Sequence, residues 1–257
     1  ISSFALQAAD ADVRGSAEFH GDGQGLERLV FEQLTLGSNS ARGTVARQPG
    51  GHLSINMEGD RFDVAGFLDD GEEEDEESDL SFDLQARIGH LTAGDKRALR
   101  NVSLDLVYGR NYVRRLELDA ALNAKNTVQI RYIPVDGRYD LKVKTDNAGA
   151  MLRSWDLLDR VDGGKLVVTG SHAAPEEPLV GRIDMRDYVL TKAPIMAKVL
   201  QFMSLTGILS SFQDKGLAFS RLEADYSLQD GVLSVLKSRA FGTSIGITAK
   251  GKLGIDD

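Results

Sequence analysis

Apolar and polar residues alternate along much of this chain, and this alternation constrains its fold more than any other feature. Successive side chains of a β-strand point to opposite faces of the sheet, so a period of two is typical of a strand with one apolar and one wet face. The clearest runs have their apolar positions at Leu80, Phe82, Leu84, Ala86 and Ile88, at Val102, Leu104, Leu106 and Tyr108, at Leu116, Leu118, Ala120 and Leu122, at Val128, Ile130 and Tyr132, and at Tyr139, Leu141 and Val143. Another run follows at Leu222, Ala224, Tyr226 and Leu228. We therefore expect a mainly β fold.

The N-terminal part of the chain shows the same organisation with weaker signals. Glycine-rich turns occur at 21–25, 37–39 and 50–51, with short strand candidates between Ser16 and Met57. Strands and helices do not alternate regularly, so we expect antiparallel pairing. About fourteen strands at a spacing of ~4.8 Å would extend over ~65 Å in one sheet. Such a sheet, apolar on one face, must close, pair with another sheet or hold an apolar ligand.

Two segments carry helical signals. The first, near 147–158, has Asp146 or Asn147 as its N-cap, and the second, near 194–212, begins at Pro194 and is apolar around most of its circumference. We expect residues 1–145 to form an antiparallel meander and residues 146–257 to add both helices to the same sheet. The strands expected in this second part are 166–169, 183–189, a pair joined by the turn at Asp230-Gly231, and a final hairpin-like pair over 245–255.

The acidic residues are concentrated in one run. Nine of the 39 acids lie within 69–79, and without them the chain has 30 acids against its 30 Lys and Arg. The run predicts a solvated loop, or alternatively a contact with a basic partner or weakly held cations. The balanced remainder disfavours nucleic-acid binding. There are no cysteines, which excludes disulfides and thiolate chemistry.

No catalytic or metal-binding pattern emerges from the sequence. The four histidines lie at positions 20, 52, 90 and 172. No two of them have the spacing that would place them on one helix turn or one strand face, and none lies near a carboxylate motif. The run 242–246 matches G-x-S-x-G, but a nucleophile elbow needs a following helix and a later histidine, whereas this run is followed by an alternating segment and no histidine. We therefore expect a protein that is not an enzyme and has no metal and no cofactor.

The last third of the chain resembles a known family. The resemblance rests on Ala193-Pro194 before an apolar helix, Leu205-Thr206-Gly207, Lys215-Gly216-Leu217-Ala218-Phe219, Asp230-Gly231-Val232-Leu233 and Gly242-Thr243-Ser244-Ile245-Gly246-Ile247-Thr248. In this order the motifs resemble the C-terminal region of AsmA-like proteins, and within them the YhdP-type branch. The resemblance is strong over 146–257, and before that only the strand rhythm is similar.

The resemblance implies a fold and a function. AsmA-like proteins are long bacterial envelope proteins, anchored in the inner membrane and projecting into the periplasm, which are associated with moving phospholipid toward the outer membrane. We therefore expect an extended, curved, open sheet with an apolar groove that holds acyl chains, and a membrane anchor upstream of this segment. The residues expected to line the groove are Leu80, Phe82, Leu84, Ile88, Val102, Leu104, Leu106, Leu116, Leu118, Leu122, Val128, Ile130, Leu141, Val143, Leu200, Met203, Phe212, Leu222, Tyr226 and Leu228.

Two alternatives remain open at this point. The alternation does not distinguish a face that contacts lipid from one that forms an ordinary protein core. A scaffold or assembly module that engages another envelope protein through its β edges or its acidic loop also agrees with the resemblance.

Overall fold

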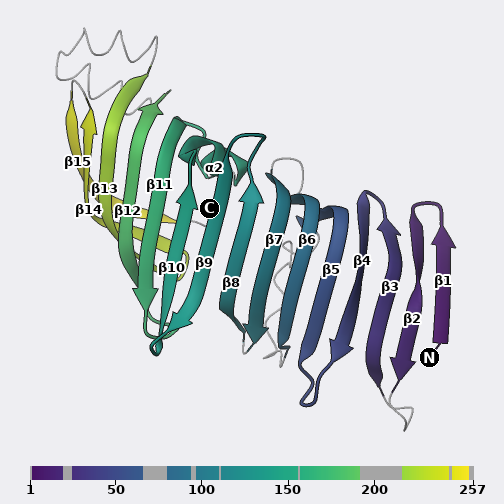
Figure 1. Cartoon of the computed structure of the whole chain (residues 1–257). Coiled ribbons are helices and arrows are strands. Elements are labelled where there is room, and N and C mark those ends of the chain that lie inside the picture. Colours follow the sequence, from purple (N-terminus) through teal and green to yellow (C-terminus); the bar gives the residue numbers. More distant parts are fainter. Residues whose placement is uncertain are drawn as a thin grey trace. The chain divides into compact units, whose positions relative to one another are not determined.

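The computed structural model describes residues 2–19, 25–65, 80–93, 97–109, 111–155, 157–191, 216–242 and 245–254. The expected helix at 194–212 and the acidic run at 69–79 lie outside these residues, as do Leu200, Met203 and Phe212. The chain forms two compact units, one of residues Ile1–Ala124 with Arg131–Ile133 and one of Lys125–Ile130 with Pro134–Asp257. The described residues are mainly β-strand in both units, which confirms the expected fold class (Figure 1).

The first unit is an open sheet whose strands follow one another in chain order. Its strands are β1 (Ser2–Ala8), β2 (Ala11–Phe19), β3 (Leu26–Leu36), β4 (Asn39–Arg47), β5 (Leu53–Asp63), β6 (Phe82–Ala93), β7 (Arg97–Gly109) and β8 (Tyr112–Ala121). Neighbouring strands pair in antiparallel fashion from β1 to β5 and from β6 to β8. The sequence did not indicate β1, which lies before the first expected strand.

The prediction of purely antiparallel pairing is wrong for one pair. Strands β5 and β6 run parallel, with Leu53 opposite Phe82 and Asp63 opposite Thr92. Parallel neighbours cannot be joined by a tight hairpin, because the chain must return to the end at which the first strand started. The long connection from 64 to 81, which contains the acidic run, is consistent with this requirement.

The second unit contains the remaining strands and the described helix. Its elements are β9 (Thr127–Val135, without Arg131–Ile133), β10 (Arg138–Thr145), α2 (Ala148–Ser154), β11 (Val161–His172), β12 (Leu179–Leu190), β13 (Leu217–Gln229), β14 (Val232–Gly242) and β15 (Gly246–Gly254). From β10 to β15 each strand pairs with the next in antiparallel fashion. The expected turn at Asp230-Gly231 is confirmed. Both residues have positive φ, 49° and 67°, as a two-residue hairpin with the right-handed strand twist requires.

Helix α2 is shorter than expected. The Asn147 side chain accepts a hydrogen bond from the Ala150 N–H at 2.9 Å, which confirms Asn147 as the N-cap. The helix ends at Ser154 and not near 158, because the chain turns and the Leu157 N–H donates to the Leu152 carbonyl at 2.9 Å. Ala148 and Met151 are buried where α2 contacts β11 and β12.

Two strand predictions in this unit need correction. Strand β11 begins at Val161, five residues before the expected start at 166, so Gly163-Gly164 lies within the strand. Both glycines have positive φ, and a Cβ at Gly164 would lie 3.0 Å from the Tyr188 Cβ. The chain after Ile245 forms one strand, β15, paired with β14, and not a hairpin of its own.

Candidate functional site

The strand register of the first unit places apolar side chains in continuous rows across the sheet. Residues directly opposite each other on paired strands point to the same face, so a row can be followed from strand to strand. One row is Ala17, Leu29, Val45, Ile55, Leu84, Leu106 and Leu116, and the next is Gly15, Phe31, Gly43, Met57, Ala86, Leu104 and Leu118. We call the surface formed by these rows the apolar face of the first unit.

The residues predicted from the sequence lie on this face but differ in accessibility. Ile88 and Val102 are opposite each other and only 2% and 3% exposed, so they form core. Leu80, just before β6, is 46% exposed. The remaining predicted residues of the unit are half-buried: Phe82, Leu84, Leu104, Leu106, Leu116, Leu118 and Leu122. A ligand on this face would meet these half-buried side chains first.

The apolar face extends over strands whose contribution the sequence did not show. Leu29, Val45 and Ile55 lie in the same row as Leu84, and they add to the groove residues that the sequence predicts. A small hollow of about 50 Å³ lies on this part of the face, among Phe31, Leu34, Ala41, Val45, Ile55 and Met57. Glycines at positions 15, 43 and 59 interrupt the alternation in these strands, which weakens the sequence signal.

The second unit has an apolar face of the same kind. One row contains Thr145, Leu166, Met185, Leu222, Ala240 and Ile247, and another contains Leu141, Gly170, Gly181, Tyr226, Val235 and Gly251. Of the predicted residues, Val128 and Tyr226 are buried, and Ile130, Leu141, Val143, Leu222 and Leu228 are half-buried. Leu141 and Tyr226 belong to one row, although 85 positions separate them in the sequence.

Two tyrosines on this face are held in an apolar environment. Burial raises the pKa of Tyr188 and of Tyr226 to about 12 in each case, because the phenolate would lose its hydration. The Tyr226 hydroxyl is buried without a hydrogen-bond partner in the described structure. The position of this hydroxyl explains why residue 170 is a glycine, because a Cβ there would lie 2.5 Å from the Tyr226 hydroxyl oxygen.

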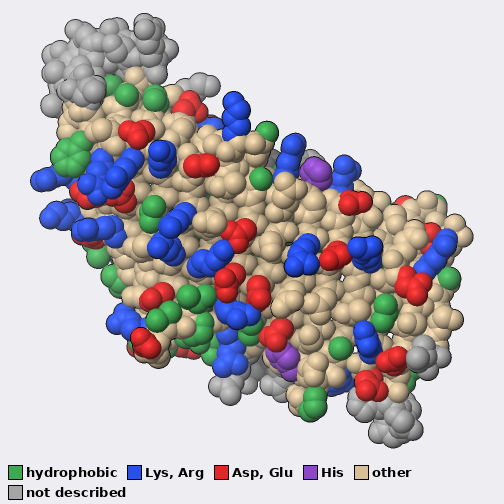
Figure 2. Space-filling view, in the orientation of Figure 1, with side chains coloured by type: hydrophobic (Ala, Val, Ile, Leu, Met, Phe, Trp, Pro, Cys, Tyr) green, Lys and Arg blue, Asp and Glu red, His purple; other side chains and the backbone are tan. Residues whose placement is uncertain are grey.

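The opposite face of the first unit carries charged side chains of both signs. Glu58 on β5 lies between two arginines, with Oε2 2.8 Å from Arg42 Nη2 and Oε1 3.6 Å from Arg87 Nη1. The hydrogen bond from Arg42 lowers the pKa of Glu58, and all three side chains are exposed to solvent. Figure 2 shows charged side chains of both signs spread over the face turned to the viewer.

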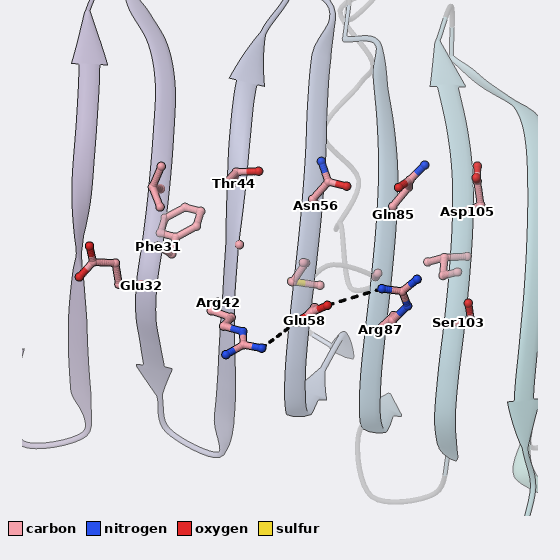
Figure 3. A pocket seen from close by; sticks show the side chains of 15 residues that line it. Phe31, Glu32, Arg42, Thr44, Asn56, Glu58, Gln85, Arg87, Ser103 and Asp105 are labelled. Atoms are coloured by element: carbon pink, nitrogen blue, oxygen red, sulfur yellow. Dashed lines mark hydrogen bonds and ion pairs between the residues drawn. The ribbon is translucent and has the colours of Figure 1, made fainter. Parts of the chain in front are cut away.

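This charged face is hollowed over β3 to β7, with a volume of about 610 Å³ (Figure 3). Arg42, Glu58 and Arg87 form one row of its lining, and Thr44, Asn56, Gln85 and Asp105 form the next, in register across four strands. This hollow could not be foreseen from the sequence, since it depends on pairing β5 with β6. Its chemistry suits polar groups that exchange hydrogen bonds with amides and carboxylates.

A hydrogen-bonded group lies where β5 and β6 begin. The His52 ring contacts Ser81 through Nδ1 and Asp83 through Nε2. The sequence shows no carboxylate motif near His52, and the pairing of β5 with β6 brings the single carboxylate of Asp83 to its ring. His172, by contrast, is buried, with Nδ1 3.1 Å from the Glu177 carbonyl oxygen and its ring edge-on to Tyr139.

The G-x-S-x-G match does not have the geometry of a nucleophile elbow. Such an elbow requires a helix directly after the motif. Here the strand β15 begins at Gly246, the last residue of the match. Residues 243–244, including the serine, lie outside the described residues.

Comparisons with models of protein families, with curated proteins and with solved structures found no match for this chain. Across the described ranges no helix has the length and apolar character needed to cross a membrane.

Proposed function

We propose that this chain is a lipid-binding segment of an AsmA-like, YhdP-type envelope protein. In this proposal the apolar faces hold phospholipid acyl chains while the headgroups remain toward solvent. The parent protein, anchored in the bacterial inner membrane, would expose the segment in the periplasm and move phospholipid between the inner and outer membranes. The resemblance of residues 146–257 suggests the family, and the apolar rows are the observation that carries the proposal.

The apolar rows support this proposal through their continuity. In the first unit, Leu84 and Leu106 are opposite each other, and Leu106 is in turn opposite Leu116, so apolar contacts run without a polar interruption from β6 to β8. Each CH₂ group transferred from water to such a surface gains ~0.8 kcal/mol. Because these contacts are not directional, an acyl chain held by them can slide along the rows.

The separation of the two faces supports the same proposal. The charged side chains on the opposite face, such as those of Arg42 and Glu58, pair with each other and are solvated. That face therefore gains nothing from an acyl chain, whereas half-buried leucines on the apolar face lose contact with water when one binds. This difference predicts binding to one face only.

Native mass spectrometry of the purified chain, followed by organic extraction, tests the proposal. We expect phospholipid to co-purify with the protein, or to be taken up from vesicles of phosphatidylethanolamine and phosphatidylglycerol. A protein that carries no lipid and takes none up from such vesicles would overturn the proposal.

The second candidate function is a scaffold that binds another envelope protein, and the edge of the first sheet favours it. Strand β1 pairs only with β2 among the described residues, and its sequence, Ser2–Ala8, contains no charge and no proline. Charged residues or proline usually protect such edges from pairing with further strands. A stoichiometric protein partner that is lost when Ala5 is replaced by proline would support this function.

A further inference from the structure

Ser81, His52 and Asp83 lie in contact on the first unit, joined by one hydrogen bond and one close nitrogen–oxygen contact. The His52 Nδ1 atom lies 3.0 Å from Ser81 Oγ, and His52 Nε2 lies 3.2 Å from Asp83 Oδ1. The histidine and the aspartate remain accessible, with side chains 31% and 52% exposed. This arrangement joins a hydroxyl, an imidazole and a carboxylate in the order used by serine hydrolases.

The parallel pairing of β5 with β6 creates this arrangement. Ser81 and Asp83 are two residues apart in an extended chain, so their side chains point to the same side. The Leu53 N–H donates to the Ser81 carbonyl at 2.9 Å, and Ser54 is opposite Asp83. This register places His52 between the serine and the aspartate. The site lies on the charged face, because Phe82 between them belongs to the apolar face.

The carboxylate determines which ring nitrogen carries the proton. A carboxylate accepts hydrogen bonds and does not donate them, so in the neutral imidazole the hydrogen must be on Nε2, which faces Asp83. The Nδ1 atom then carries the lone pair and accepts the hydrogen of the Ser81 hydroxyl. This is the tautomer a general base needs, with the two nitrogens exchanged relative to the usual serine triad.

We propose that Ser81 is an activated nucleophile for acyl transfer from water-soluble carboxylic esters. In this reaction Ser81 Oγ attacks the ester carbonyl carbon while its proton moves to His52 Nδ1. The tetrahedral intermediate expels the alcohol, which takes the proton from His52, and an acyl-Ser81 remains. Water then attacks the acyl group, gives its proton to His52, and releases the carboxylic acid as Ser81 recovers its hydrogen. Asp83 holds the imidazole in the reactive tautomer.

Gly109 leaves Ser81 the space it needs. A Cβ at position 109 would lie 3.1 Å from the Ser81 Cβ, closer than ordinary contact.

A general base of this kind accelerates proton transfer by about 10²- to 10⁴-fold. Since the site faces the solvent on the side opposite the apolar rows, this activity is independent of lipid binding.

Acetylation by p-nitrophenyl acetate tests the proposal on the whole chain. We expect a burst of p-nitrophenolate and one acetyl group on the peptide that contains Ser81, found by mass spectrometry. Ser81→Ala should abolish both. His52→Gln should slow acetylation of Ser81 by about 10²-fold or more, because glutamine can hydrogen-bond but cannot accept the proton. Asp83→Asn provides a second, milder variant and should slow the same reaction.

Ser103→Ala is the matched control, since Ser103 is an exposed serine on the same face and should not contribute to the burst. Circular dichroism establishes that each variant keeps its strands. Acetylation of Ser81 no faster than that of Ser103, or unchanged in folded His52→Gln and Asp83→Asn, would overturn the proposal. The three side chains would then only tie the starts of two strands together.

Discussion

The ring of Tyr188 on β12 stacks on the ring of Phe219 on β13, with centroids 5.3 Å apart and planes inclined by 12°. The two residues are opposite each other in the register, and both are buried. They lie in the part of the second unit where α2 covers the sheet, because a Cβ at Gly164 would touch both Tyr188 and Ala148 of the helix. This stack therefore joins two strands beneath the helix.

Truncating Phe219 should destabilise the second unit strongly. Phe219→Ala leaves a cavity beneath Tyr188, and we expect the free energy of unfolding to fall by about 3–5 kcal/mol. Trp155, the single tryptophan of the chain, follows α2 and allows urea unfolding of this unit to be monitored by fluorescence. Phe241→Ala on β14 removes a ring that is 40% exposed, so we expect the free energy of unfolding to fall by less than about 1 kcal/mol. Equal losses for the two variants would contradict this account of the core.

Asp184 should make unfolding of the second unit depend on acid pH. Partial burial opposes its ionisation, but hydrogen bonds from Arg186, at 2.9 Å, and from Arg221 outweigh this effect, so the pKa of Asp184 lies below its usual value. A lowered folded-state pKa stabilises the fold above the unfolded-state pKa, and this stability is lost as the pH falls from about 4 through the folded-state pKa.

The matching variant is Asp184→Asn. We expect it to lower the free energy of unfolding by about 1 kcal/mol at pH 7, and this loss should be smaller at pH 3. Asp225→Asn is the control, because Asp225 has one arginine partner at 3.2 Å and a more exposed side chain. Urea titrations at both pH values give the comparison. A loss that persists unchanged in acid would show that the ion pairs are not its cause.

Docking of α2 should depend on the absence of a side chain at Gly149. A Cβ at this position would lie 2.1 Å from the Val161 carbonyl oxygen, which belongs to the sheet and cannot move aside easily. We expect Gly149→Ala to destabilise the second unit by about 2 kcal/mol or more, despite the better helix propensity of alanine. Gly251→Ala is the control, since a Cβ at that position would meet nothing within 4 Å. Trp155 fluorescence and hydrogen exchange of the helix amides report the outcome.

The sequence predicts local structure in this chain better than long-range pairing. The alternating runs around Leu84, Leu104 and Leu118 form strands in the structure, because alternation and nearby turns encode each strand locally. The run Ser2–Ala8 carries a weaker strand signal, since its polar residues do not alternate cleanly with its apolar ones. The pair Gly163-Gly164 is typical of turns, because glycine readily adopts positive φ, yet here it lies within β11.

The candidate sites depend on information that the local pattern lacks. His52 and Ser81 are 29 positions apart and meet only because β5 and β6 are parallel neighbours. The hollow on the charged face requires the same pairing, since Asn56 and Gln85 line it side by side. The apolar face could be predicted strand by strand, but the division into buried residues such as Ile88 and half-buried ones such as Leu84 follows from packing between distant strands.

Lipid binding should respond to a charge on one face of β6 and not to the same charge on the other. Leu84 is half-buried on the apolar face, and its neighbour Gln85 is exposed on the charged face. We expect Leu84→Asp to weaken phospholipid uptake by about tenfold or more, because an acyl chain would have to desolvate the carboxylate. Gln85→Asp places the same group one residue further along the strand, where we expect no effect.

Native mass spectrometry with vesicles of phosphatidylethanolamine and phosphatidylglycerol measures this uptake, and circular dichroism establishes that both variants are folded. If Leu84→Asp does not fold, Leu106→Asp with the control Ser103→Asp makes the same comparison on β7, because Ser103 is exposed on the charged face. Equal uptake by folded variants of the two faces would place the lipid elsewhere, whereas loss confined to the apolar face would locate it along the rows that cross β6 and β7.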